Sequence, residues 1–356
     1  MRIVFDNIVY ALQKAGGISV VWSNLIKRIA ASHENVLFLE YPNHNISRKA
    51  INLPIDKTKP LTGKNIYFKR YLDPNVKENK PFIFHSSYFR ISNNPNAINV
   101  TTVHDFTYEL YVKNPLKRWL HCWQKHHAIW KSDYVVCISE NTKADLLRFL
   151  PGFPEERIKV IYNGIDRNIF YPTKDRHTED YALFVGNRDP YKNFDKIIDP
   201  LCRLSLTLKI VGAPLNDTEV KMLKHHKCRY KYIGRVNDDT LNQLYNNAFC
   251  LLYPSEYEGF GLPVLEAQSA GCPVIAFNGS STKEIIGNTP LLLQTTSSDE
   301  IMSKISMLND PVIRHSIVTE GMANAALYSW DKMATEYDLL YKEIEETNAK
   351  NHKRHS

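Results

Sequence analysis

The sequence predicts an α/β protein with two doubly wound domains, each built from a parallel sheet covered by helices. Short apolar runs alternate with helical segments almost throughout the chain, and this alternation is typical of parallel sheets. The chain has 356 residues, 43% of them hydrophobic, which is sufficient for two cores of ordinary size.

The first domain is predicted from apolar runs bounded by turn residues. Strands are expected at 2–5, 36–40, 82–85, 100–104 and 134–138, and helices at about 18–31 and 140–150. The turn cluster Pro151-Gly-Phe-Pro154 precedes a strand at 158–162 and a polar stretch at 163–180. We place the domain boundary in that stretch, because Asn163-Gly164 and Pro172 interrupt regular structure there.

A second alternating series begins at Tyr181. Its expected strands are ALFVG, LTLKIVG, YKYIGRV, CLLYPS, PVIAF and LLLQ, with helices near 194–203, 217–226, 238–247, 262–271, 281–287 and 298–309. Ligands of open parallel sheets bind beyond the carboxyl ends of the strands. We therefore expect two facing domains whose loops meet around a cleft.

Composition narrows the class of protein. No apolar stretch approaches the length of a membrane span, and the first residues lack the pattern of a secretion signal. The six cysteines are scattered without CxxC spacing, as expected for reduced thiols. We therefore expect a cytoplasmic protein. We expect no nucleic-acid partner, since a net charge of +7 is weak support without a recognised binding module.

A basic, aromatic run with helical spacing, KNPLKRWLHCWQKHHAIWK, spans Lys113 to Lys131. One interpretation is an interfacial helix that rests on anionic lipid at the inner membrane face, which would make the protein peripheral to the membrane. The other is that the tryptophans belong to the core and the lysines are solvated, the commoner arrangement in a globular domain.

The chemistry is predicted to centre on two acids, Glu258 and Glu266, that bracket the stretch GFGLPVL. Gly259 and Gly261 precede a helix expected to begin at Leu262, and helix N-termini with glycines bind diphosphates well. Glu266 would then reach ribose hydroxyls, and Glu258 the sugar hydroxyls. The alternative is an ordinary loop, because such glycine pairs also occur where nothing binds and surface glutamates are usually solvated.

Other strand ends carry further candidates. Gly16 and Gly17 precede the first long helix and suit a phosphate or sugar, although an ordinary turn explains them equally well. His104 ends a strand and can bond a sugar hydroxyl, although a lone histidine is more often structural. Arg188 and Lys192 follow the first strand of the second domain, where both can serve as cations for a diphosphate.

The segment PSEYEGFGLPVLEAQSAGCPVIA resembles the signature of retaining glycosyltransferases of family 4. Further landmarks occur in the same order, namely the N-terminal glycine pair, VHD, CISENTKADL, VIYNGIDRNIF, VGNRDPYKN and IGRV. The resemblance implies a GT-B fold, with an acceptor domain at 1–165, a crossover helix at about 330–346 that returns to it, and a donor domain at 170–329. We expect residues 347–356 to form a flexible tail.

The resemblance also implies roles. His104 would contact the transferred sugar, Arg188 and Lys192 the phosphates, Glu258 the distal sugar hydroxyls and Glu266 the ribose. Gly16 and Gly17 would lie near the donor's diphosphate. The backbone of Gly259, Phe260, Gly261 and Leu262 would bind the sugar or the phosphates, and Arg235 and Val236 would border the base. One departure from the family pattern is Ser280-Ser281-Thr-Lys-Glu, which lacks the usual proline.

The substrates implied are a nucleotide-sugar donor and a saccharide or lipid-linked oligosaccharide acceptor, as in surface polysaccharide synthesis. GDP-mannose is our hypothesis for the donor, because VGNRDPYKN resembles mannosyltransferase-like members, and UDP-hexoses stay open. We expect no metal, since the sequence lacks an Asp-x-Asp run and any His/Cys cluster with the spacing of metal ligands, and no cofactor beyond the donor. The resemblance implies retention of the anomeric configuration. The sequence identifies no carboxylate that could serve as a nucleophile. We therefore favour attack by the acceptor on the same face of the sugar from which the phosphate departs.

Two alternatives are a nucleotide-sugar epimerase of the same fold and a catalytically silent partner subunit. The epimerase would release an altered donor without an acceptor. The silent subunit would be expected to lack some of the candidate residues, and this chain retains them. A dehydrogenase is disfavoured because the first strand-to-helix turn lacks GxGxxG.

Overall fold

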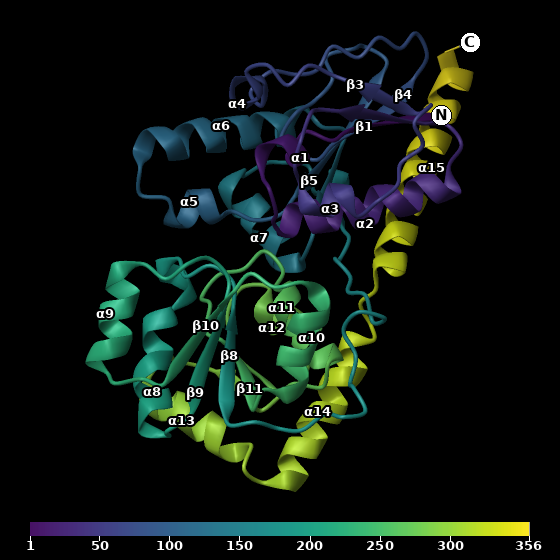
Figure 1. Cartoon of the computed structure of the whole chain (residues 1–356). Helices are drawn as coiled ribbons and strands as arrows, with labels where there is room; N and C mark the ends of the chain where they lie inside the picture. The colour runs from purple at the N-terminus through teal and green to yellow at the C-terminus, as the bar shows by residue number, and fades with distance from the viewer. Residues whose placement is uncertain (356) are drawn as a thin grey trace. The chain divides into compact units, whose positions relative to one another are not determined.

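The computed structural model describes residues 1–355 and divides the chain into two compact units (Figure 1). Unit 1 comprises Met1–Gly164 together with the C-terminal segment from Trp330, and unit 2 comprises Ile165–Ser329. Each unit is built on one parallel sheet flanked by helices, so the predicted fold class is confirmed. Within the described residues, no helix is both long and apolar enough to cross a membrane.

The sheet of unit 1 has seven strands in the order β3-β2-β1-β4-β5-β6-β7. They are β1 (Arg2–Asp6), β2 (Val36–Glu40), β3 (Thr58–Pro60), β4 (Phe82–Ser86), β5 (Ala97–Val103), β6 (Tyr134–Cys137) and β7 (Ile158–Val160). The direction of winding reverses between β1 and β4, which is where doubly wound sheets open a crevice for ligands. Strand β3 was not predicted, because this short edge strand is largely exposed and ends in proline.

Eight helices of the described chain belong to unit 1: α1 (Val9–Leu12), α2 (Gly17–Ser32), α3 (Ile46–Lys49), α4 (Ile66–Lys69), α5 (Thr107–Tyr111), α6 (Pro115–Lys131), α7 (Glu140–Phe149) and α15 (Trp330–His355). Phe5 of β1 lies at the centre of the core. Its ring stacks on Phe38 at 5.6 Å between centroids and meets Trp22 of α2 edge-on at 5.7 Å. Because Phe5 also contacts Tyr341 of α15, α2 and α15 cover the same face of the sheet.

The C-terminal helix α15 is anchored by hydrogen bonds far apart in sequence. Tyr341 Oη lies 2.7 Å from His85 Nδ1, and Tyr337 Oη lies 2.9 Å from Thr102 Oγ1. The helix ends at His355, whereas we expected its end near residue 346 and a flexible tail beyond it. The segment beyond 346 contains no glycine or proline and several good helix formers, so nothing in it stops the helix.

The sheet of unit 2 has six strands in the order β10-β9-β8-β11-β12-β13. They are β8 (Tyr181–Val185), β9 (Thr207–Val211), β10 (Tyr230–Gly234), β11 (Cys250–Tyr253), β12 (Val274–Phe277) and β13 (Leu292–Leu293). The helices are α8 (Ile198–Arg203), α9 (Asp217–His225), α10 (Asp238–Asn247), α11 (Leu262–Ser269), α12 (Thr282–Ile285), α13 (Ser298–Met307) and α14 (Pro311–Ala325). All six strands correspond to predicted ones, and α14 was not predicted.

The parallel arrangement brings the carboxyl ends of these strands to one edge of unit 2. The loop after β8 carries Arg188 and Lys192, the loop after β10 carries Arg235 and Val236, and the loop after β11 carries Glu258 and leads into α11. The core beneath this edge is apolar, with Phe184, Leu208, Leu252 and Ile275 all buried. The sheet therefore presents the predicted residues of this unit on one rigid rim.

Candidate functional site

Lys192 and Glu258, two of the predicted residues, are in direct contact. Lys192 Nζ donates to Glu258 Oε1 at 2.7 Å, and each side chain is only 14% exposed. Tyr253, at the end of β11, also hydrogen-bonds the Glu258 carboxylate. Burial, reinforced by that carboxylate, raises the pKa of Tyr253 well above its usual value, so the phenol stays a neutral donor.

The backbone around Glu258 is held by two serines that follow β12. The Ser280 hydroxyl accepts from the Glu258 N–H at 2.9 Å, and the Ser281 hydroxyl donates to the carbonyls of Glu258 and Phe260 at 2.7 and 2.9 Å. In the sequence this pair stood out only as a departure from a family pattern. Its role depends on β11 and β12 being neighbours in the sheet, which the local sequence does not reveal.

The stretch Gly259–Leu262 forms the turn from β11 into α11. Gly261 occupies the N-cap position with φ of +106°, a conformation that residues with a β-carbon rarely adopt. Pro263 lies in the first turn, and no side chain of the described residues caps the helix. The N-terminal amides and the positive end of the helix dipole are therefore arranged as in helix termini that bind anions.

Arg188 is more tightly held than the sequence suggested. Its Nε donates to Glu219 at 2.8 Å, and its Nη2 donates to the carbonyls of Ala213 and Pro214 at 2.8 and 2.7 Å. Nη1 is buried without a hydrogen-bond partner among the described residues. Strand β8 lies between β9 and β11 in the sheet. Arg188 bonds residues that follow β9, whereas Lys192 bonds a residue that follows β11, so the two side chains extend to opposite sides of β8.

Glu266 lies in α11, where Tyr245 Oη donates to its Oε2 at 3.0 Å. Burial raises the pKa of Glu266 to about 7, and the hydrogen bond from Tyr245 opposes this shift only in part. A carboxyl group kept at this energetic cost, one turn inside the helix, is typical of a site that binds a polar group. Arg235 is exposed and Val236 is half-buried beyond the edge strand β10.

In unit 1, His104 directly follows β5 and is partly exposed. Burial of its ring lowers the pKa of His104 to about 4, so the imidazole is neutral near pH 7 and has one donor and one acceptor nitrogen. Gly16 is the N-cap of α2 and Gly17 its first residue. A β-carbon on Gly16 would lie 2.6 Å from Gln13 Oε1, whereas Gly17 has open space around it.

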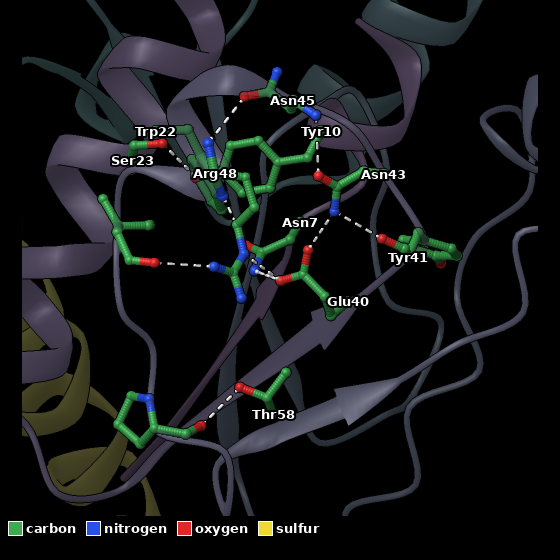
Figure 2. A network of polar contacts seen from close by, with 12 residues as sticks. Asn7, Tyr10, Trp22, Ser23, Glu40, Tyr41, Asn43, Asn45, Arg48 and Thr58 are labelled. Carbon is green, nitrogen blue, oxygen red and sulfur yellow. Dashed lines mark hydrogen bonds and ion pairs between the residues drawn. The ribbon is translucent and has the colours of Figure 1, made fainter. Parts of the chain in front are cut away.

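A polar network fixes the loops after β1 and β2 in unit 1 (Figure 2). The carboxylate of Glu40 accepts from Asn7 at 3.0 Å, from Asn43 at 2.9 Å and from Arg48 Nε at 3.0 Å. Trp22 of α2 donates to Asn7 at 2.8 Å. The network thereby ties α2, and with it the Gly16-Gly17 start of that helix, to the carboxyl edge of the sheet.

Helix α6 exposes its tryptophans. Trp119, Trp123 and Trp130 are 61%, 50% and 44% exposed, and Leu116 on the same face is 72% exposed. The side chains it buries include Gln124 and Lys125. Lys125 Nζ donates to Glu109 of α5 at 2.7 Å. The interpretation that the tryptophans belong to the core is therefore wrong, because their rings are exposed while His121, Gln124, Lys125, Ala128 and Ile129 occupy the inner face.

Comparisons with known proteins agree with this architecture. A family model described as Glycosyltransferase Family 4 matches residues 15–168, and one described as Glycosyl transferases group 1 matches residues 166–322. An uncharacterized glycosyltransferase of Methanocaldococcus jannaschii is 24% identical over 360 residues, covering 97% of this chain and 99% of the relative. The O-antigen chain mannosyltransferase B of Escherichia coli is 26% identical over 294 residues, covering 75% of this chain and 76% of the relative.

Two solved structures show the same fold. Anabaena HepE in complex with UDP and glucose has a TM-score of 0.72 at 16% identity, covering 96% of this chain and 99% of that one. Sucrose-phosphate synthase from Thermosynechococcus elongatus has a TM-score of 0.77 at 17% identity, and the alignment covers 98% of this chain and 100% of that one.

Proposed function

The chain belongs to the GT-B glycosyltransferases that combine a family 4 domain with a group 1 domain, and from that premise we propose that it transfers mannose from GDP-mannose. The acceptor we propose is a saccharide or lipid-linked oligosaccharide in the synthesis of a surface polysaccharide. The Escherichia coli relative, an O-antigen chain mannosyltransferase, supports the choice of mannose. UDP-hexoses are the second candidate donors, because the Anabaena neighbour binds UDP-glucose in its crystal structure.

The observation that carries the proposal is the pairing of Lys192 with Glu258 beside the N-terminus of α11. A bound diphosphate competes with Glu258 for the Lys192 ammonium, and releases the carboxylate to accept hydrogen bonds from hydroxyls of the sugar. Arg188 Nη1 offers a further donor on the same rim. Glu266 is assigned to the ribose, with Arg235 and Val236 beside the base.

Catalysis would come from stabilising the negative charge that develops on the leaving diphosphate. Preorganised donors contribute about 2–4 kcal/mol each when they face such charge in a dry site. In our proposal Lys192, Arg188 and the first amides of α11 supply these donors, and His104 contacts the transferred sugar.

We further propose that the reaction retains the anomeric configuration and needs no metal. The acceptor hydroxyl attacks the anomeric carbon on the face from which the phosphate departs. The bond from that carbon to the phosphate oxygen breaks, and the phosphate takes the acceptor's proton. Within the described residues there is no group of three or more His, Cys, Asp or Glu side chains arranged to hold a metal ion. Transfer that continues in excess chelator would support this part of the proposal, and transfer restored only by a divalent cation would overturn it.

A screen of nucleotide sugars by thermal unfolding tests the donor. A donor at about 100 times its dissociation constant stabilises the folded state by roughly 2.7 kcal/mol. We expect GDP-mannose to raise the melting temperature more than GDP, UDP-glucose or NAD at equal concentration. Stabilisation by UDP-glucose alone would move the assignment to a UDP-hexose. An altered sugar nucleotide released without any acceptor would favour the epimerase instead.

A further inference from the structure

Unit 1 contains a cavity that the candidate transferase residues do not line. Its volume is about 310 Å³, at the lower end of the range for small-molecule sites in proteins. The walls come from β2 and Tyr41, from β3, from residues 61–62, 69 and 72–78, and from Arg90, which follows β4. The cavity thus lies entirely within unit 1.

The walls combine apolar and cationic surfaces. Leu37 and Leu39 of β2 form apolar parts, together with Leu61, Leu72 and Val76. The walls also contain four cations, Lys59, Lys69, Lys77 and Arg90, and two carboxylates, Asp73 and Glu78. Both carboxylates are already engaged elsewhere: Glu78 accepts from Arg2 at 2.8 Å, and Asp73 accepts from the Ile91 N–H and from Asn93, each at 3.1 Å.

Arg90 is a buried cation whose hydrogen-bonding capacity is only partly used. Its side chain is 2% exposed, its Nη2 donates to Tyr41 Oη at 3.0 Å, and its Nε lies 3.4 Å from Asp6 Oδ2. Neither Nε nor Nη1 makes a hydrogen bond within the part of the chain that the structure describes. Buried donors in native proteins are nearly always paired, and an unpaired one carries a desolvation penalty that a bound acceptor removes.

The position of this arginine in the sheet also favours a ligand. Asp6 ends β1 and Arg90 follows β4, so the pair stands where the winding direction reverses. Open α/β sheets bind ligands at this reversal. Asp6 is not part of the cavity wall, so it neutralises one side of the guanidinium and leaves the other available.

We propose that this cavity binds a small amphipathic anion, a phosphate or carboxylate carried on an apolar chain. The anionic group accepts hydrogen bonds from Arg90 and is attracted by Lys59 and Lys77, while the chain lies on Leu37 and Leu39. This site does not depend on the identity of the donor or on the transfer reaction.

Calorimetric titration of the whole protein with three probes tests the site: hexyl phosphate, inorganic phosphate and 1-hexanol. Hexyl phosphate should bind at least about tenfold more tightly than either of the others, because it alone uses both kinds of wall. Arg90→Lys keeps a positive charge but loses the planar fork, and should weaken hexyl phosphate binding roughly tenfold. Circular dichroism checks that this variant folds.

Lys59→Gln provides a second variant, which does not disturb the buried ion pair between Arg90 and Asp6. Lys59 is an exposed side chain at the cavity wall, and its replacement should weaken hexyl phosphate several-fold. Lys64→Gln is the matched control, because Lys64 is exposed in the neighbouring segment and lies outside the cavity wall. Its affinity should match that of the unmodified protein.

The site would be refuted by the absence of hexyl phosphate binding, by equal affinity for inorganic phosphate, or by binding that both Arg90→Lys and Lys59→Gln leave unchanged. Transfer assays identify the source of the natural anion. If hexyl phosphate competes with the acceptor, the cavity holds the anionic end of the acceptor. If it binds without affecting transfer, the cavity holds a separate anion.

Discussion

At the scale of single residues, Glu258 is the most informative position, because it holds Lys192 while its backbone is fixed independently by Ser280 and Ser281. Glu258→Gln should reduce the turnover number by on the order of 10²-fold, as does the loss of one preorganised polar group elsewhere. The melting temperature should change little, because the glutamine oxygen still accepts from Lys192. Kinetic assays with the donor identified by the screen provide the measurement.

Glu256→Gln is the matched control for that variant. Glu256 is exposed in the same loop and accepts from Asn193 at 3.1 Å, which glutamine also does. Its turnover should stay within about twofold of the unmodified enzyme, as is usual for surface substitutions. Equal losses in both variants would mean that loop geometry, and not the Glu258 carboxylate, controls the rate.

Glu266 predicts a dependence of stability on pH. Burial raises the pKa of Glu266 from 4.5 to about 7, so between these values the folded protein holds a proton that the unfolded chain has lost. The contribution of this group to the free energy of unfolding is greatest below pH 4.5. It falls as the pH rises to about 7 and does not change further above that pH. The loss is on the order of 3 kcal/mol, which is the free energy that corresponds to this difference in pKa between the folded and unfolded states.

Glu266→Gln should therefore melt at a higher temperature than the unmodified protein at pH 8 and at the same temperature near pH 4.5. Glutamine keeps an acceptor for Tyr245 but cannot ionise. Thermal unfolding across this pH range measures the difference, and donor titrations should show weaker binding in the same variant. A melting difference that does not change with pH would show that the carboxyl group is not perturbed in this way.

The candidate residues that the sequence revealed are those whose chemistry is visible at fixed local spacing. Lys192, Glu258 and Gly261 follow strands and precede a helix, so their place on the rim could be predicted. The residues that orient them could not. Glu219 on Arg188 is 31 positions away and Ser281 is 23 positions away from Glu258, and only the order of strands in the sheet makes them neighbours.

At the scale of elements, α14 shows why a helix can escape prediction. Its buried residues are Ile317, Gly321 and Ala325, which give no strong apolar stripe. A β-carbon on Gly321 would lie 3.3 Å from the Gln268 side chain of α11, so a small residue permits close packing there. A periodic pattern in the sequence indicates a helix when large apolar residues line one face, whereas α14 packs mainly through small residues.

Helix α6 is the element for which we predict membrane contact. Its exposed face carries Trp119 and Trp123. Three cations of the helix, Lys117, Arg118 and Lys131, are also exposed, and the helix contains no acid. We expect sedimentation with phosphatidylglycerol vesicles, weaker sedimentation with phosphatidylcholine, and release as salt screens the attraction. Replacing both tryptophans by serine should lower the partition coefficient at least about tenfold, because two large apolar surfaces are lost.

Val312→Ser with Leu339→Ser is the control for this prediction. These two side chains are 77% and 59% exposed, and they lie on α14 and α15. The control pair removes two exposed apolar side chains without altering α6 and should leave vesicle binding unchanged. Binding lost equally in the two double variants, or none in the unmodified protein, would refute the membrane role of α6.

At the scale of the whole molecule, the chain builds unit 1 from both of its ends. The chain leaves this unit after Gly164, forms unit 2, and returns at Trp330. The first and last residues of unit 2, Ile165 and Ser329, are paired by an isolated parallel β-bridge. The returning helix α15 places Tyr337 and Tyr341 against β5 and β4. The stability of unit 1 therefore depends on side chains more than 230 positions from their partners.

Tyr337→Phe combined with Tyr341→Phe tests this dependence with little change in packing. The double variant leaves Thr102 and the neutral, fully buried His85 each short of a hydrogen-bond partner, at a cost of about 1–3 kcal/mol for each group. Scanning calorimetry should show a lower melting temperature for unit 1. The nucleotide donor should still stabilise unit 2, because Tyr337 and Tyr341 are not part of unit 2. A variant that lost both the stability of unit 1 and the donor-induced stabilisation would show that the two units do not unfold separately, and would contradict the prediction.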